Sequence, residues 1–269
     1  MSSVRVDPIA PYIGGKHKLA ARITAIIEAT PHDLYAEPFV GMGGIFLRRS
    51  RAAKVEIIND YSQDVATLFR ILQRHFPQFL DVLKWQLTTR ADFDRLAQVD
   101  PTTLTDLERA ARFLYLQRTG FGGKVAGRNF GTSRTGPARF DLNKLVPLLE
   151  AVHERLASVV IERLPYEDFI RRYDREGALF YLDPPYYGSE ADYSDTADLF
   201  SRLDFDRLAL VLRTIRGRFL VSLNDHPGVR RAFDGFAFEE IETTYTIGGN
   251  GSAKRVGELM ITKPQNMSS

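Results

Sequence analysis

The sequence predicts an α/β protein whose sheet is built from both ends of the chain. Residues 34–60 form the pattern strand, glycine turn, helix, and second strand ending in an acid, Asp60. This order is typical of the opening of a nucleotide-binding βαβ unit. Further along, the apolar run 178–182 stops at Asp183-Pro-Pro, as a buried strand must when prolines remove its donors. A helical and loop-rich stretch, 63–157, lies between these two parts and is predicted to interrupt the sheet.

The other elements follow from apolar periodicity and turn residues. Helices are expected within 9–30 after the Gly14-Gly15 turn, from Ile45, across most of 64–116 with a capped start at Thr105, and over 142–156, 166–173 and 204–216. Strands are expected over 34–41, 55–60, 159–164, 219–223, 236–245 and 258–262. Trp85 is expected in the helical core, and His226 is expected to cap a turn, with lining the pocket as the less favoured alternative.

Composition excludes several classes of protein. The 269 residues include no cysteine, which excludes disulfides and thiolate metal sites and fits the cytoplasm. The five histidines have no metal-ligand spacing, so no metal is expected. No apolar run is long enough for a membrane span, and the N-terminus has no secretory core.

Basic residues are concentrated in one part of a chain whose net charge is only +2. No Asp or Glu occurs between Arg109 and Arg139, where the basic residues are Arg109, Arg112, Arg118, Lys124, Arg128, Arg134 and Arg139. Within this stretch, 119–137 is rich in glycine and contains Phe121 and Phe130, which predicts a loop or hairpin. Such a zone is typical of a surface that contacts phosphates, with a solvated loop as the alternative.

The end of the strand 178–182 is the strongest candidate for a reactive site. Asp183 is followed by two prolines and two tyrosines, at the sheet edge where open α/β proteins bind ligands. An acceptor beside a flat aromatic ring suits a planar substrate with an amino group, such as adenine or cytosine. Taken alone, the segment is equally well explained as a turn.

The glycine turns do not match the signatures of NAD or ATP sites. Gly41-x-Gly43-Gly44 breaks the dinucleotide spacing, and His17 stands where a P-loop has Ser or Thr. Asp60 is placed to accept hydrogen bonds from ribose hydroxyls. Together these features favour a nucleoside cofactor without a pyrophosphate, such as S-adenosylmethionine.

Five motifs, in order along the chain, resemble the Dam-type, D12-class DNA adenine-N6 methyltransferases. They are Pro11-Tyr-Ile-Gly-Gly-Lys16, Glu37-Pro-Phe-Val-Gly-Met-Gly-Gly-Ile-Phe-Leu47, Asn59-Asp60, Asp183-Pro-Pro-Tyr186 and Glu258-Leu-Met-Ile-Thr262. The resemblance covers nearly the whole chain. It implies a Rossmann-like, S-adenosylmethionine-dependent catalytic domain (1–62 plus 158–269) and a helical target-recognition insertion (63–157). It further implies a site-specific enzyme acting on double-stranded DNA, of the kind used in restriction–modification, in a prokaryotic or phage-infected cell; we expect a monomer.

The resemblance also implies roles for individual residues. Cofactor binding is implied for Tyr12, Lys16, Glu37, Phe39, Gly41, Gly43, Asp60, Asp168, Phe169 and Asp183. Catalysis is implied for Asp183, Pro184 and Tyr186, and DNA contact for Lys124, Arg128, Arg134, Arg139, Lys254 and Arg255. Two positions depart from the usual pattern: Met42 replaces a small residue, and Gly122 replaces a polar side chain that reads bases in some relatives.

The expected chemistry follows from the weak nucleophilicity of adenine N6, whose lone pair is delocalised into the ring. Asp183, helped by the Pro184 carbonyl, would accept hydrogen bonds from the amino group and direct the lone pair at the methyl group. Tyr186 would stack on a target base that has left the duplex. Transfer would be a direct in-line displacement that depends on positioning and preorganised charge. The alternatives are an RNA or protein acceptor on the same fold, or a catalytically silent DNA-binding relative.

Overall fold

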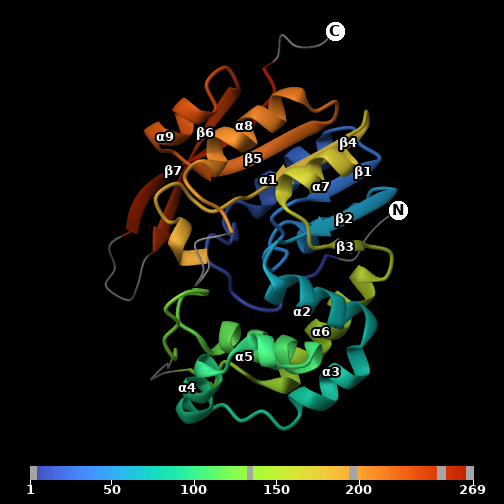
Figure 1. Cartoon of the computed structure of the whole chain (residues 1–269), viewed down its shortest axis with the longest axis vertical. Coiled ribbons are helices and arrows are strands. Elements are labelled where there is room, and N and C mark those ends of the chain that lie inside the picture. The colour runs from blue at the N-terminus through green and yellow to red at the C-terminus, as the bar shows by residue number, and fades with distance from the viewer. Residues whose placement is uncertain (1–4, 132–135, 194–198, 247–252, 265–269) are drawn as a thin grey trace.

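The computed structural model describes residues 5–131, 136–193, 199–246 and 253–264. Within these residues, seven strands form one sheet in the order β3-β2-β1-β4-β5-β7-β6 (Figure 1). The strands are β1 (Leu34–Glu37), β2 (Val55–Asn59), β3 (Val160–Glu162), β4 (Ala178–Leu182), β5 (Arg218–Asn224), β6 (Ala237–Thr246) and β7 (Ala253–Thr262). Strands β1 to β5 pair in parallel, whereas β7 runs antiparallel to both β5 and β6. The predicted α/β class is confirmed.

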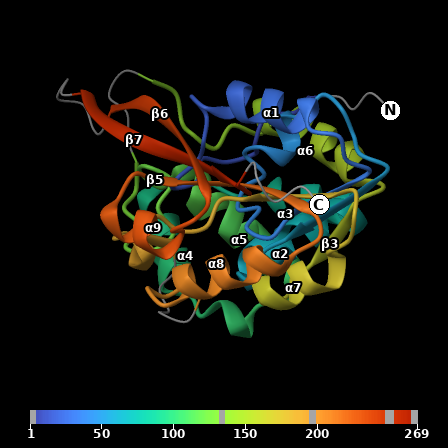
Figure 2. The same cartoon turned by 90° about the horizontal axis from the view of Figure 1, so that it is seen from above.

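Helices cover both faces of the sheet (Figure 2). One face carries α1 (Ala20–Ala29), and the other carries α7 (Tyr166–Tyr173), α8 (Asp204–Thr214) and α9 (Pro227–Ala232). Successive side chains of a strand point to opposite faces. Tyr181 of β4 therefore lies in the buried cluster that contains Ile23 of α1, whereas Phe180 and Leu182 lie in the cluster that contains Phe205 of α8.

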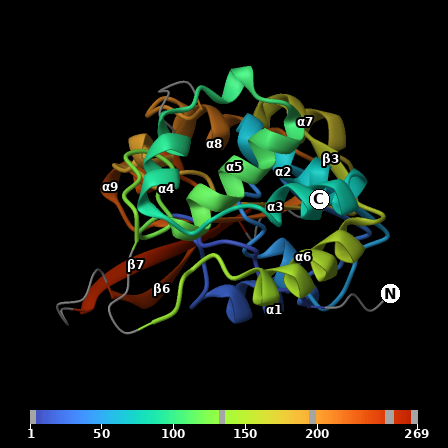
Figure 3. The same cartoon turned by 90° about the horizontal axis from the view of Figure 1, so that it is seen from below.

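The region between β2 and β3 is helical, as predicted (Figure 3). It contains α2 (Gln63–Arg74), α3 (Phe76–Leu83), α4 (Arg90–Gln98), α5 (Asp106–Thr119) and α6 (Leu142–Leu156). Helix α5 packs against α2, α3 and α4. Its start has the predicted capping box, in which Thr105 and Glu108 bond reciprocally to each other's backbone N–H groups.

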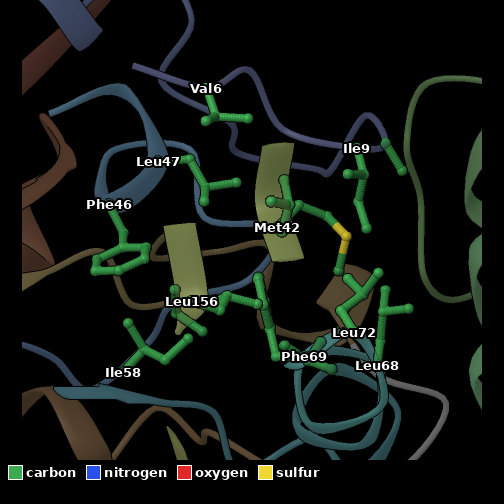
Figure 4. Packing of buried hydrophobic residues seen from close by; sticks show 14 of the residues in the cluster. Val6, Ile9, Met42, Phe46, Leu47, Ile58, Leu68, Phe69, Leu72 and Leu156 are labelled. Atoms are coloured by element: carbon green, nitrogen blue, oxygen red, sulfur yellow. The ribbon is translucent and has the colours of Figure 1, made fainter. Parts of the chain in front are cut away.

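The helical region shares one core with the sheet layer. Met42 and Leu47, which follow β1, lie in the same buried cluster as Leu68 and Leu72 of α2 and Leu156 of α6 (Figure 4). The Met42 side chain is only 2% exposed and fills this junction. Burying a side chain of this size contributes about 1.5–3 kcal/mol. The turn after β1 is therefore anchored from the helical side.

Two expectations for local structure are wrong. The helix expected from Ile45 is a single 3-10 turn, η1 (Phe46–Arg48), because Arg49 turns inward, bonds to Glu56 at 2.8 Å and lies 3.5 Å from the centre of the Tyr35 ring. Trp85 is 85% exposed. Helix α3 ends at Leu83, so Trp85 lies beyond the apolar stripe to which its neighbours belong.

None of the helices in the described ranges is long and apolar enough to cross a membrane. Over the same residues, no group of three or more His, Asp or Glu side chains is arranged to hold a metal ion.

Candidate active site

A cavity of about 860 Å³ opens at the carboxyl ends of β1, β2, β3 and β4. This is the edge at which the sequence placed the acids that end β2 and β4. Among the expected cofactor residues, those that line the cavity are Tyr12, Lys16, Glu37, Phe39, Gly41, Asp60, Asp168 and Asp183. Gly43 and Phe169 lie outside its lining. Segments that are distant in the sequence thus meet around one space of the size that a nucleoside cofactor needs.

The glycine turn after β1 is held against Asp60. The Gly41 N–H donates to Asp60 Oδ2 at 2.9 Å, and the Ser62 N–H donates to Oδ1 at 2.9 Å. Gly41 has φ +50°, and a Cβ there would lie 3.0 Å from the Tyr12 ring. Both the backbone conformation and the close approach therefore require glycine. Burial raises the pKa of Asp60 to about 6, against the effect of the two N–H donors.

Gly43 was expected to bind the cofactor, but the structure gives it a role in packing. It also has positive φ, but a Cβ at this position would meet Leu47 at 2.9 Å, and the residue does not reach the cavity. Its small size lets the turn pack on η1. Gly43 therefore supports the turn on the side that faces away from the cavity.

Glu37 closes the inner end of β1 and is only 2% exposed. It accepts a hydrogen bond from the Tyr35 hydroxyl at 2.5 Å. Burial is the main cause that raises the pKa of Glu37 to about 8, and the nearby Asp183 carboxylate adds to the rise. Glu37 is therefore mostly protonated at neutral pH, and a positive charge brought into the cavity would favour its ionised form.

An aromatic wall faces the Gly41 turn. Phe39 lies 5.5 Å from Tyr166 and 5.7 Å from Phe200 between ring centres, and all three line the cavity. Sequence reasoning found Phe39 and missed the other two. Tyr166 opens α7, and Phe200 comes from a segment whose place depends on the whole fold.

The two residues expected beside the cofactor on α7 separate in the structure. Asp168 lies at the rim, 57% exposed and 3.3 Å from Arg171. Phe169 points away, fully buried, with its ring 5.1 Å from that of Tyr173. Its contact with the sheet places α7 rather than the ligand.

Asp183 and Tyr186, for which the resemblance implies catalysis, both meet Lys16; Lys16 and Asp183 line the cavity, and Tyr186 does not. Lys16 Nζ lies 2.9 Å from Asp183 Oδ1 and 2.7 Å from Glu258 Oε1, and it donates to the Tyr186 hydroxyl at 2.6 Å. That hydroxyl donates to Glu258 Oε2 at 2.7 Å. The Lys16 and Glu258 side chains are 0% exposed, and Asp183 keeps 21%. Lys16, expected at the methyl donor, therefore also belongs to the group around Asp183.

Asp183 is the part of this group that a ligand can reach. Burial raises its pKa to about 6, although Lys16 acts in the opposite direction. Ser222 Oγ donates to Asp183 Oδ1 at 3.3 Å. Lys16 and Ser222 thus both bind Oδ1, and Oδ2 is the oxygen placed to accept from a substrate.

The turn after Asp183 is fixed by β5. Asn224 accepts from the Tyr187 N–H at 2.9 Å and donates to the Tyr187 carbonyl at 3.1 Å. Pro184 is buried and does not line the cavity. His226 caps α9 by accepting from the Gly228 N–H at 2.9 Å, which confirms the favoured expectation, and its ring stacks on Tyr187.

A family model described as D12 class N6 adenine-specific DNA methyltransferase matches residues 12–247, which include every residue of this site except Glu258. The chain belongs to this family. It is an adenine-specific DNA methyltransferase.

Three relatives span nearly the same length as this methyltransferase. It is 25% identical to the Type II methyltransferase M1.LlaDCHI of Lactococcus lactis subsp. cremoris, over 98% of each chain. It is 28% identical to the DNA adenine methylase of Serratia marcescens, over 93% of this chain and 95% of that one. It is 22% identical to the Type II methyltransferase M.CviBI of Paramecium bursaria Chlorella virus NC1A, over 89% and 91%.

The glycine-rich segment of the methyltransferase is a hairpin, as predicted, with an antiparallel bridge between Gly120 and Phe130. Phe121 at its start is 56% exposed. Lys124 is exposed and lies 3.7 Å from Asp192. Arg128 donates to Gln117 Oε1 at 3.4 Å. The hairpin thus presents a basic and an aromatic side chain on a glycine-rich backbone.

Fewer of the basic residues between Arg109 and Arg139 are available to a ligand than the sequence suggested. Arg109 pairs with Asp64 at 2.5 Å, Arg112 donates to the Leu96 and Ala97 carbonyls, and Arg118 donates to the Ile9 carbonyl. These three arginines belong to α5 and bind the protein itself. A count of charges along the chain does not show which face of a helix carries them.

Of the remaining residues expected to contact DNA, the structure describes the side chain of Arg139 alone. Arg139 donates to the Gly120 carbonyl at 3.0 Å, which ties the base of the hairpin. Arg134 lies outside the described residues. Lys254 and Arg255 lie on β7 opposite Tyr245 and Thr244, and their side chains are outside the described part.

Proposed function

We propose that the chain transfers a methyl group from S-adenosylmethionine to N6 of an adenine that has rotated out of duplex DNA. One observation carries the proposal: the Asp183 carboxylate faces the same cavity as the Gly41 turn and Asp60. An acceptor for an exocyclic amine and a pocket for a nucleoside cofactor therefore share one space.

The residues of the cavity fit S-adenosylmethionine. Asp60 oxygens, each with one N–H donor already, keep lone pairs for ribose hydroxyls. The rings of Phe39 and Tyr166 suit a purine. When bound, the cofactor supplies an electrophilic methyl group on a positively charged sulfur. The buried acids Glu37 and Asp183 face the region that would hold this charge.

The chain's own groups then act on the adenine. Asp183 Oδ2 accepts one N6–H, which favours a pyramidal nitrogen whose lone pair points into the cavity. The Pro184 carbonyl is proposed to accept the other, which requires the turn to open, because Pro184 does not line the cavity. The N–C bond would form as the methyl–sulfur bond of the donor breaks and its electron pair returns to sulfur, which leaves a neutral thioether. N6 gives up one proton, which Asp183 can take because its pKa of about 6 is high for an aspartate. Tyr186 is proposed to stack on the adenine, and its bonded hydroxyl fixes the plane of the ring.

The base must leave the duplex because Asp183 is recessed. Its side chain is 21% exposed, at the bottom of a concave site. Rotation out of the stack costs a few kcal/mol, part of which stacking on an aromatic ring returns. The hairpin, with Phe121 and Lys124 exposed, is proposed to hold the DNA while the base turns.

We assign target recognition to residues 63–157, with Lys124, Arg128, Arg134 and Arg139 as DNA contacts and Lys254 and Arg255 as further backbone contacts. Catalysis is assigned to residues 1–62 with 158–269. A monomer in the cytoplasm of a prokaryotic or infected cell is consistent with a DNA substrate and a chain without cysteine.

Transfer of tritium from methyl-labelled cofactor tests the proposal. Unmethylated genomic duplex, total RNA and a protein extract are offered separately, and the labelled duplex is digested to nucleosides. Label in N6-methyldeoxyadenosine from the duplex is expected. Label that appears in RNA or protein instead, or in a different nucleoside, would contradict it.

A further inference from the structure

Glu258 holds a place in the active site that the chemistry above does not use. It lies on β7, is 0% exposed and does not line the cavity, and its carboxylate is paired inside the protein. Both of its oxygens face the group around Asp183: Oε1 forms an ion pair with Lys16 at 2.7 Å without the geometry of a hydrogen bond, and Oε2 accepts from the Tyr186 hydroxyl. A buried carboxylate is costly unless its charge is compensated. Its placement against these two residues therefore needs an explanation.

The first part of the explanation is charge. Lys16 carries one positive charge and lies within 3 Å of two carboxylates, at 2.9 Å from Asp183 and 2.7 Å from Glu258. With Asp183 alone, Lys16 would neutralise the oxygen pair that has to accept from adenine. With Glu258 present, the three groups together carry a charge of −1 when Asp183 is ionised. Asp183 is then a stronger hydrogen-bond acceptor.

The second part is geometry. The Tyr186 hydroxyl has one hydrogen, and it accepts from Lys16 while it donates to Glu258. Glu258 therefore sets the direction of that hydrogen and, with Lys16, the position of the ring. In the sheet, Glu258 pairs with Asn224 of β5, which holds the backbone of Tyr187. One pair of residues on adjacent strands thus fixes both tyrosines of the turn.

The other ionisable and polar groups around Asp183 do not replace Glu258. Glu37 on β1 has a pKa raised to about 8, so it is mostly uncharged at neutral pH, and it accepts from the Tyr35 hydroxyl. Tyr181 on β4 bonds to Ser222 on β5, which in turn donates to Asp183. Neither of these groups pairs with Lys16 as Glu258 does, at 2.7 Å.

We propose that Glu258 is a positioning residue for methyl transfer, which balances the charge of Lys16 so that Asp183 stays an effective acceptor and which fixes the Tyr186 ring. This inference rests on the proposed role of Asp183.

The test compares wild type with Glu258→Gln, a substitution that keeps the shape and removes the charge. Single-turnover methyl transfer to unmethylated genomic duplex is measured as a function of pH, and cofactor affinity is measured by calorimetry. The plateau rate is expected to fall about 10- to 100-fold, because small displacements of reacting groups reduce rates by such factors. The cofactor Kd is expected to stay within about twofold, because Glu258 lies outside the cavity.

The pH profile separates positioning from a merely structural role. Glu258 raises the pKa of Asp183 and Lys16 lowers it. Glu258→Gln should therefore move the acid limb of the rate to lower pH, and Lys16→Met should move it to higher pH. The double variant, in which neither buried charge is left alone, should lie between them, and it serves if either single variant does not fold.

The matched control is Glu240→Gln on β6, the strand that pairs with β7. Glu240 is an exposed carboxylate paired with Arg230, and this variant should behave as wild type. A Glu258→Gln enzyme with the wild-type plateau and acid limb would overturn the inference, as would a double variant whose acid limb coincides with that of Lys16→Met. If wild type and Glu240→Gln transfer no methyl group at all, the proposed function fails instead.

Discussion

The cavity floor and the glycine-rich hairpin (120–130) hold their charged side chains in opposite ways. On the floor, Lys16 and Glu258 are fully buried and lie within 2.7 Å of each other. In the hairpin, Lys124 is half exposed, and its partner Asp192 is 3.7 Å away. Buried charges in a fixed arrangement act on a reacting atom without reorganisation. Exposed charges are screened and exchange partners easily, which suits contact with a polyanion. The difference indicates that chemistry and DNA affinity can be changed separately.

The largest effect on one ligand alone is expected at the Gly41 turn, which is proposed to hold the cofactor. Gly41→Ala should weaken cofactor binding by about tenfold or more, because a side chain at φ +50° costs about 1–2 kcal/mol and the new Cβ would also press on the Tyr12 ring. DNA binding without cofactor should stay close to wild type. Calorimetry with the cofactor and a DNA gel-shift titration measure the two affinities.

Gly235→Ala is the matched control. It carries the same kind of strain, since Gly235 has φ +84°, but its added Cβ would make only an ordinary contact at 3.5 Å, and the residue lies outside the cavity lining. Equal losses in the two variants would contradict the assignment of Gly41 to the cofactor site.

A smaller effect with the opposite selectivity is expected in the hairpin. The double change Lys124→Ala and Arg128→Ala should weaken DNA binding several-fold and reduce the slope of log affinity against log salt by about 0.9 for each phosphate that is no longer neutralised. The cofactor Kd should not change. The affinity is measured between low and moderate salt.

Arg213→Ala removes an exposed arginine on α8, far from the hairpin in the sequence, whose guanidinium donates to the Asp234 carbonyl. Its salt slope should equal that of wild type. A hairpin variant that keeps the full wild-type slope would count against the hairpin as a DNA surface.

The smallest effect on ligand binding is expected at Gln117, a residue that connects the cavity floor with the hairpin. Its side chain is buried and donates to the Pro11 carbonyl at 2.9 Å and to the Gly123 carbonyl at 2.6 Å, so it connects the N-terminal motif 11–16 with the hairpin. Gln117→Ala leaves two carbonyls without this donor, at about 1–3 kcal/mol of unfolding free energy. Tm should fall by several degrees, and both affinities should weaken slightly.

Differential scanning calorimetry and the two binding assays measure these changes. Gln78→Ala, on the exposed side of α3, is the control. A loss confined to one ligand would show that Gln117 does not join the regions.

The sequence predicted those parts of the site that are local. Asp60 was predicted because it ends the apolar strand 55–60 of a βαβ pattern, and Asp183 because two prolines stop the strand that precedes it. The capping box at Thr105 was found in the same way. Gly41 and Gly43 looked alike in the sequence, and their separate parts follow only from what each Cβ would touch.

Parts of the site that depend on distant contacts were not predictable. Lys16 and Glu258 stand near opposite ends of the chain, and their ion pair exists because β7 enters the sheet beside β5. Arg112 appeared to be one of a set of surface charges, but the packing of α4 against α5 places it on two carbonyls. Such contacts depend on the direction of a side chain within the finished fold.

The most direct test of the account is the pH dependence of methyl transfer by wild type and by Asp183→Asn. Because the pKa of Asp183 is raised to about 6, the carboxylate loses its charge as the pH falls through this value, and the wild-type rate should fall with it. Asp183→Asn should lose about 10²- to 10⁴-fold in rate, show no such acid limb and still bind the cofactor. An Asp183→Asn enzyme with the rate and the acid limb of wild type would contradict the account.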